Sequence, residues 1–180
     1  MSLNKDRRAG LLAIGLTDLR FDESIAPWTA LGIGGPAEAL VVQDADDDAM
    51  QLLRRWCRRE RLTLTEPPTD PQVLVRDGGI KGVVVVPAGE PPEPNRTARL
   101  FLEPRLPISS AQLLRDSGAA GIRLRGVRID PSDPNLVINE GEAKAHDVVA
   151  LQAWLSSQVA QRTGVELESA LTLVGIDPKR

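Results

Sequence analysis

The stretch that decides the fold is Thr29-Ala-Leu-Gly-Ile-Gly-Gly-Pro-Ala37, which is followed later in the chain by Val75-Arg-Asp-Gly-Gly-Ile-Lys-Gly-Val-Val84. Between these two glycine-rich stretches, residues 38–43 form an apolar run that predicts a strand entering a core. A helix is expected next, with an apolar stripe made of Met50, Leu52, Leu53 and Trp56. Short strands over residues 62–65, 73–75 and 82–86 complete a β-α-β-β pattern, which is typical of a small α+β unit.

A Pro-rich stretch, residues 87–98, divides the chain, because its four prolines remove backbone donors and favour extended conformations. Beyond it the sequence predicts a helix over 110–117, one strand over 122–129 with a bulge at Gly126, and a strand over 136–138. A long helix over 144–162 then leads to a final strand over 166–174. We therefore expect an α+β protein with two small lobes, divided into an N-terminal extension (1–25), an N-terminal lobe (26–89), a Pro-rich linker (90–99) and a C-terminal lobe (100–180).

The composition of the 180-residue chain, 42% apolar and 26% charged, is that of a folded globular protein. A net charge of −3 leaves no excess of cations, which argues against nucleic-acid binding. No apolar run is long enough to span a bilayer, and acidic residues directly follow the short apolar run at residues 10–16. We therefore expect a cytoplasmic protein without membrane insertion.

Few side chains offer recognisable chemistry. Cys57 is the only cysteine, which argues against an internal disulfide or a structural zinc site. It is interpreted as a helix cysteine packed beside Trp56, although the neighbouring arginines could also lower its pKa. His146, the only histidine, has no partner nearby in the sequence for a triad or a metal cluster, which favours a capping or solvent-facing role. The acidic residues 44–48 favour the start of a helix over a metal site.

The sequence offers one candidate surface for a ligand or partner. Arg123, Arg125 and Arg128 alternate with apolar residues, so they form either a basic face for a phosphate or a solvated strand edge. Asn135 and Asn139 are the other candidate residues of this surface. No catalytic, cofactor-binding or metal-ligating residue is predicted.

Further motifs, together with the glycine-rich stretches, resemble the two ends of the MurB family, the flavin-dependent UDP-N-acetylenolpyruvoylglucosamine reductases of peptidoglycan synthesis. These motifs are Leu113-Leu-Arg-Asp-Ser-Gly118, Asn135-Leu-Val-Ile-Asn139 and Val165-Glu-Leu-Glu168. The resemblance implies that the N-terminal lobe derives from the first flavin-binding subdomain and the C-terminal lobe from the third, which helps to hold the UDP-sugar. The middle subdomain of the family has no counterpart, and the Pro-rich stretch stands in its place.

The positions that bind and react in this family hold other residues here. The family has a Gly-x-Gly-Ser-Asn turn that holds the flavin diphosphate on bare backbone N–H groups, whereas the aligned segment here is Pro68-Thr69-Asp70-Pro71-Gln72. Arg99 aligns with the proton-donating serine, and Ala170 aligns with the acidic glutamate near the end of the family's chain. Glu168 lies two residues from that position, about 6–7 Å along a strand. The resemblance therefore implies that FAD binding has been lost.

We expect from this a catalytically inactive, MurB-like pseudoenzyme that is kept as a binding or structural module. The family's pathway links it to peptidoglycan synthesis or cell division, with a protein partner from that machinery or a second copy of the chain as a homodimer. The alternative is a protein that still binds a UDP-sugar or nucleotide. An active UDP-N-acetylmuramate dehydrogenase is the third reading, and it would have to work without the middle subdomain.

Overall fold

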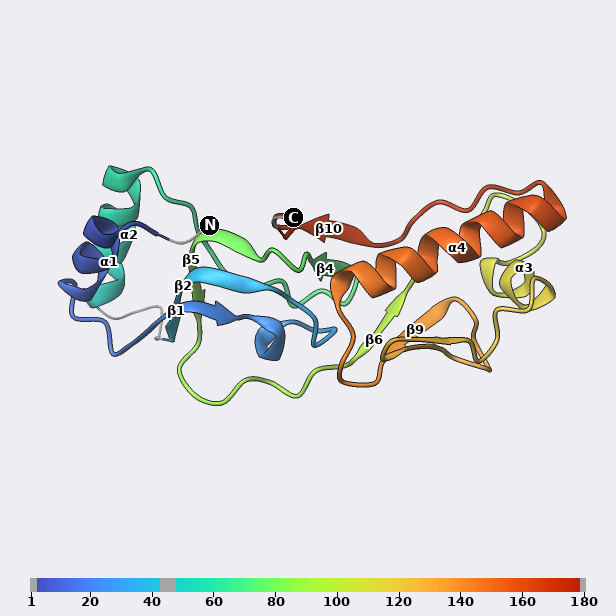
Figure 1. The fold of residues 1–180 in the computed structure, drawn as a ribbon, viewed down its shortest axis with the longest axis horizontal. Coiled ribbons are helices and arrows are strands. Elements are labelled where there is room, and N and C mark those ends of the chain that lie inside the picture. The colour runs from blue at the N-terminus through green and yellow to red at the C-terminus, as the bar shows by residue number, and fades with distance from the viewer. Residues whose placement is uncertain (1–2, 43–47, 179–180) are drawn as a thin grey trace.

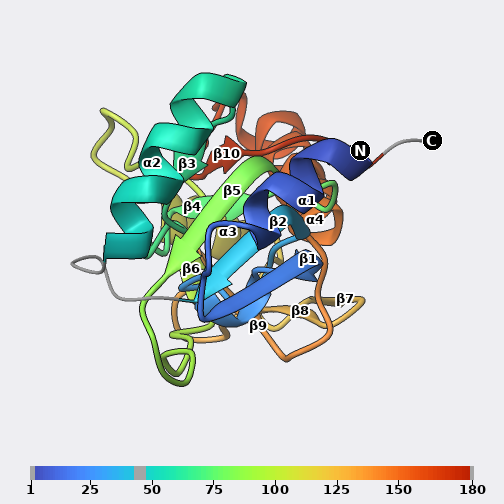
Figure 2. The same cartoon turned by 90° about the vertical axis from the view of Figure 1, so that its left-hand side faces the viewer.

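The computed structural model describes residues 3–42 and 48–178, and its N-terminal lobe is built on a four-stranded sheet (Figures 1 and 2). The strands lie in the order β1 (Asp18–Ser24), β2 (Pro36–Val42), β5 (Ile80–Val86) and β3 (Leu64–Thr65). Strand β1 is antiparallel to β2, whereas β2, β5 and β3 run parallel to one another. The first 25 residues therefore supply a strand to this sheet.

Both faces of this sheet are covered, which explains why β2 and β5 are apolar along most of their length. On one face, α1 (Lys5–Leu12) and α2 (Asp48–Glu60) pack against alternate strand residues, namely Ala39, Val41, Val83 and Val85. On the other face, the strand residues between them pack against Trp28 in a short 3₁₀ turn over Ala26–Trp28, namely Leu40, Val42, Val84 and Val86.

The C-terminal lobe has a four-stranded antiparallel sheet covered by helices. Its strands lie in the order β6 (Thr97–Arg99), β9 (Leu136–Asn139), β8 (Val127–Ile129) and β7 (Arg123–Leu124). Two helices, α3 (Ser110–Asp116) and α4 (Ala145–Thr163), bury their apolar faces in the core of this lobe. Helix α4 ends at Gly164, which has a φ of 71° and so adopts the left-handed conformation that glycine favours.

The last strand of the chain ties the two lobes together. Strand β10 (Thr172–Val174) pairs in parallel with β4 (Val73–Val75), although about a hundred residues separate them along the chain. Figure 1 shows α1 and α2 at one end of the long axis, α3 and the C-terminal end of α4 at the other, and β4 and β10 between them. The expected α+β architecture with two lobes is confirmed.

The single strand expected over residues 122–129 is wrong, because this segment is a hairpin. Strands β7 and β8 pair antiparallel across the two-residue loop Arg125-Gly126. Both loop residues have positive φ angles, 43° and 79°, which are the values that a tight hairpin turn requires. A two-residue turn keeps the alternation of apolar and polar residues, so the sequence pattern alone does not distinguish the hairpin from one long strand.

Three smaller expectations need correction or lie outside the described residues. Leu52 is 51% exposed, since it lies about 100° around the helix from the buried Leu53. Only residues 172–174 of the expected final strand are regular, and the segment before them makes an isolated bridge between Ser169 and Phe101. Residues 43–47, which include most of the acidic cluster, lie outside the described residues.

Candidate functional site at the junction of the two lobes

The glycine-rich stretches form the junction where three loops touch backbone to backbone. Gly35 N–H donates to the Arg76 carbonyl, and Ile176 N–H donates to the Gly79 carbonyl. A Cβ atom on Gly35 would lie 2.3 Å from the Asp77 carbonyl oxygen, and one on Gly79 would lie 1.7 Å from that of Pro36. Gly79 also has a φ of 80°. The loops can approach this closely only because glycine has no side chain.

Asp77 lies two residues before Gly79, and its side chain caps the start of α4 in the other lobe. Its Oδ1 accepts a hydrogen bond from Ala145 N–H at 2.8 Å, and its Oδ2 accepts one from His146 N–H at 3.0 Å. Burial by itself raises the pKa of Asp77. Hydrogen bonds from the His146 side chain and from the backbone of His146 and Ala145 lower the pKa by a larger amount together, so it lies below its usual value. Lys144 precedes the helix and has no side-chain acceptor, so an acid from the other lobe fills the capping role.

His146 lies between two carboxylates. Its Nδ1 is 2.8 Å from Asp77 Oδ2, and its Nε2 is 3.1 Å from Asp147 Oδ1. With both ring nitrogens facing carboxylate oxygens, neither is left for a metal ion, and within residues 3–42 and 48–178 no group of metal-ligating side chains is found. Asp77 was missed in the sequence because it lies 69 residues from His146; its position just before a Gly-Gly turn was the only local signal.

The three candidate arginines lie on the β7–β8 hairpin and are ion-paired. Arg123 and Arg128 are cross-strand neighbours on the same face, and both pair with Glu140 Oε1, at 3.2 and 3.1 Å. Arg125, in the turn, has Nη1 3.7 Å from Asp147 Oδ1 and so approaches the start of α4. The structure therefore brings Arg123 and Arg128 together and leaves Arg125 beside Asp147 at the start of α4. The carboxylates of Glu140 and Asp147 offset much of the positive charge.

The two candidate asparagines hold backbone rather than forming a surface. Asn135 is fully buried, and its side chain both donates to the carbonyl and accepts from the N–H of Phe101, each at 2.9 Å. This assigns Asn135 to the core and corrects its expected surface role. Asn139 is also buried, and its Nδ2 donates to the carbonyls of Leu31 and Gly32 in the other lobe. Asn139 therefore fastens the two lobes together.

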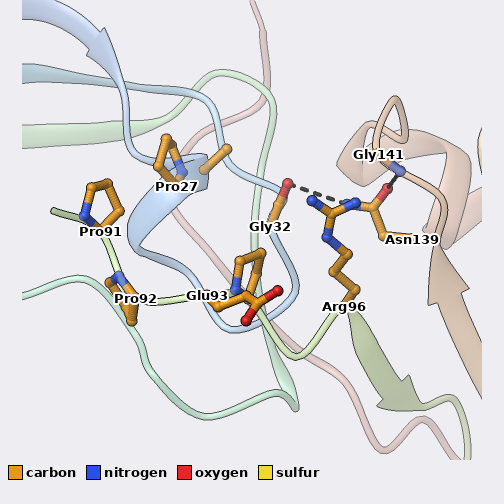
Figure 3. A pocket seen from close by; sticks show the side chains of 10 residues that line it. Pro27, Gly32, Pro91, Pro92, Glu93, Arg96, Asn139 and Gly141 are labelled. Carbon is orange, nitrogen blue, oxygen red and sulfur yellow. Dashed lines mark hydrogen bonds between the residues drawn. The ribbon is translucent and has the colours of Figure 1, made fainter.

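A pocket of about 380 Å³ opens beside Asn139 (Figure 3). The Pro-rich segment forms one wall and Pro27 another, while Gly32, Asn139 and Gly141 lie on the side of the junction. Arg96 contributes the only cationic lining side chain, and no ion-pair partner for it is found within the described residues. Glu93 also lines the pocket, so its apolar walls carry one charge of each sign, and Arg96 is the group that can contact an anionic molecule.

The three positions that the family resemblance aligns with functional residues lie close together in the structure. Gln72, at the end of the segment aligned with the flavin diphosphate turn, accepts a hydrogen bond from Arg99 N–H and donates to the Arg99 carbonyl, each at 2.9 Å. Its Nε2 also lies 3.4 Å from the Ala170 carbonyl oxygen. The Arg99 guanidinium pairs with Glu103 and Asp133. Segments distant in the sequence are therefore joined at this position by a single amide side chain.

Cys57 is buried in the core of the N-terminal lobe, as the packed interpretation requires. Burial raises the pKa of its thiol to about 11. The neighbouring arginines therefore do not activate it.

Comparison with known proteins agrees with this architecture. Residues 90–174 match the family model for the C-terminal domain of UDP-N-acetylenolpyruvoylglucosamine reductase. The reductase of Syntrophus aciditrophicus is 34% identical over 108 residues, which cover 57% of this chain and 34% of that protein. That of Heliobacterium modesticaldum is 30% identical over 86 residues, which cover 48% of this chain and 27% of that protein.

Among solved structures, that of UDP-N-acetylenolpyruvylglucosamine reductase (MurB) from Thermus caldophilus superposes with a TM-score of 0.57 and 14% identity. The superposition extends over 87% of this chain and 98% of that one. The chain thus shares the α+β fold of that structure, and its matched segments resemble the reductases. More particularly, the chain is MurB-like, and its matches span about a third or less of the length of these curated relatives. Every helix within residues 3–42 and 48–178 is too short or too polar to cross a membrane.

Proposed function

We propose that this MurB-like chain does not reduce UDP-N-acetylenolpyruvoylglucosamine and instead serves as a binding or structural module. The proposed setting is the bacterial cytoplasm, in peptidoglycan synthesis or cell division, with another protein or a second copy as the partner. The matched relatives are reductases by name, which supports the link to this pathway. The proposal of inactivity depends on the residues at the junction.

The observation that carries the proposal is the position of Gln72. A flavin diphosphate needs free backbone N–H groups that it can approach closely. Here Pro68 and Pro71 have no backbone N–H, and the backbone N–H of Gln72 donates to the Asp70 side chain. The side-chain amide of Gln72 is hydrogen-bonded to the segments around Arg99 and Ala170. The carboxylate of Asp70 would also repel a diphosphate bound at this segment. These residues do not fit FAD, and we propose that the chain binds none.

The proton donors of the family are replaced at the same place. Arg99 stands at the serine position and stays protonated at neutral pH, so it cannot supply a proton as a hydroxyl does. Its guanidinium is held 3.7 Å from Glu103 and 3.6 Å from Asp133. Ala170, at the glutamate position, has no acidic group. Even a bound substrate would therefore find no donor at either position.

The test is direct. The purified protein is incubated with FAD and desalted, and its absorbance is recorded between 350 and 500 nm, roughly the range of oxidised flavin. NADPH oxidation is then followed with and without the enolpyruvyl substrate, beside a full-length reductase as the positive control. We expect no retained flavin and no substrate-dependent oxidation. Flavin retained in equimolar amount, or turnover that depends on the enolpyruvyl group, would refute the proposal.

A second candidate function is the binding of a UDP-sugar or nucleotide without chemistry, and the pocket beside Asn139 favours it. Its one cationic side chain, Arg96, is exposed and has no ion-pair partner within the described residues, unlike the three paired arginines of the hairpin. Calorimetric titration with UDP-N-acetylglucosamine tests this. Binding should weaken about ten- to a hundredfold in Arg96→Ala, since a charged hydrogen bond is worth about 1.5–3 kcal/mol, but not in the remote control Arg54→Ala. No heat at millimolar ligand would remove this candidate.

A further inference from the structure

The ends of the molecule carry most of its exposed large apolar side chains. Within the described residues there are six such side chains, and three of them line two grooves at opposite ends. Leu12 and Leu52 are 64% and 51% exposed on α1 and α2, and Leu102 and Leu106 are 51% and 48% exposed in the segment before α3. Figure 1 places α1 and α2 at one end of the long axis and α3 at the other. Apolar surface of this kind marks sites of association.

The first groove, which we name the basic groove, lies between α1 and α2. It has a volume of about 470 Å³, an apolar lining and two arginines, and its residues are Gly10, Ala13, Ile14, Leu52, Arg55, Trp56 and Arg59. The helices approach closely here, since a Cβ on Gly10 would lie 2.8 Å from Trp56 Nε1. Arg55 has no ion-pair partner within the described residues, and Arg59 pairs with its half-buried chain neighbour Glu60, which also pairs with Arg7. The groove is therefore preformed, apolar and positively charged.

The second groove, the acidic groove, lies between the segment before α3 and the segment after α4. It has a volume of about 630 Å³ and is lined by Leu102, Glu103, Pro104, Arg105, Leu106, Val165, Glu166 and Glu168. Its walls are fixed, because Leu102 N–H donates to the Glu168 carbonyl and Ser110 Oγ–H donates to the Leu102 carbonyl. Neither Glu166 nor Glu168 has an ion-pair partner within the described residues. Acids outnumber bases in this lining by three to one.

We propose that the basic groove of one copy binds the acidic groove of the next, so that the chain associates head to tail. The two grooves have opposite charge, both include apolar side chains, and each contains charged groups without an ion-pair partner among the described residues. Because they lie at opposite ends of the molecule, the contact is heterologous and does not close on itself in a dimer. An anionic membrane could bind the basic groove, but it would leave the acidic groove unexplained. This rests on one part of the proposed function, a second copy as the partner, and specifies its surfaces; the flavin and NADPH assays test the other part independently.

The test is analytical ultracentrifugation up to about 1 mM protein, a range in which weak contacts register. The weight-average mass should rise with concentration above the 19.5 kDa of one chain. Added salt should reverse the rise, since the screening length falls from about 10 Å at 0.1 M to about 3 Å at 1 M. A mass that stays at one chain throughout the range overturns the proposal, and so does binding to anionic vesicles without self-association.

Charge reversal identifies the surfaces and separates association from unfolding. The variants Arg55→Glu/Arg59→Glu and Glu166→Arg/Glu168→Arg should each stay monomeric, because each then has two ends of like charge. Mixed in equal amounts, they should associate again, because the reversed ends of one complement the ends of the other. The matched control Glu90→Arg/Glu93→Arg changes exposed acids of the Pro-rich segment and should behave as the wild type. If the mixture stays monomeric, or the control also loses association, the pairing of these grooves is wrong.

Discussion

Substitution of Asp77 by alanine should weaken the connection between the lobes. The change removes both hydrogen bonds that Asp77 accepts from the first turn of α4, and also its contact with His146 Nδ1. Loss of a helix cap costs about 0.5–2 kcal/mol, and a stranded, partly buried N–H adds about 1 kcal/mol or more. We therefore expect the free energy of unfolding in urea to fall by about 2–3 kcal/mol. The melting temperature should fall by about 5–10 °C for a chain of this size.

The matched control is Asp177→Ala in the same junction. Asp177 makes one ion pair, with Arg76, and its side chain is 75% exposed, so its removal should cost about 0–1 kcal/mol. Comparable losses in the two variants would show that Asp77 acts only as one more surface charge. An Asp77→Ala protein as stable as the wild type would refute the capping role.

The same residue predicts a dependence on pH. The pKa of Asp77 in the folded protein lies below its ordinary value of 3.8, so as the pH falls the unfolded chain takes up the proton first. The stabilisation from its charge is therefore fully present above the unfolded pKa and is lost as the pH falls through the folded pKa. The gap in unfolding free energy between wild type and Asp77→Asn should be constant from about pH 5 to 7 and close below about pH 4. A parallel series in His146→Ala separates the effect of the imidazole, and a gap that stays open in acid would contradict the assignment.

Three further outcomes are expected. Gly79→Ala should unfold far more easily than Gly15→Ala. Both glycines have φ angles near 80°, but only a Cβ at residue 79 would clash with backbone atoms, so equal melting temperatures would refute the close approach. Gln72→Ala should lose about 1–2 kcal/mol of unfolding free energy in urea, whereas the exposed control Gln51→Ala should lose almost none. Cys57 should resist a thiol reagent at pH 7 until urea is added, since its thiol is buried with a pKa of about 11; rapid labelling of the folded protein would contradict this.

Local patterns in the sequence account for much of the fold. The apolar runs of β2 and β5 and the periodic face of α4 each reflect burial against a neighbouring layer, so they could be recognised without the structure. The hairpin at Arg125-Gly126 could not, because a two-residue turn leaves the alternation of side chains unbroken. Leu52 was misplaced because an exposed leucine next to a buried one satisfies a loose helical pattern equally well.

The candidate site was harder to predict because its contacts join distant parts of the chain. Alignment with the reductases identified residues 68–72, Arg99 and Ala170 one by one, but only the structure shows that Gln72 bonds to the other two. Arg123 and Arg128 were chosen as cations, and their shared pairing with Glu140 depends on the hairpin register. Asn135 looks in the sequence like a polar residue next to a strand, and its burial depends on its two hydrogen bonds to the Phe101 backbone.

The pairing of β10 with β4 has a consequence for how the chain acquires its structure. Val73–Val75 leaves the ribosome long before its partner Thr172–Val174, so this edge stays unpaired until residues 172–174 have been synthesised. Contacts of such long sequence separation form slowly, because the entropy cost of closing a large loop comes before the contacts stabilise the chain. Chains that stop short of residue 172 would therefore expose a free strand edge, and they should be the forms that aggregate or are degraded first.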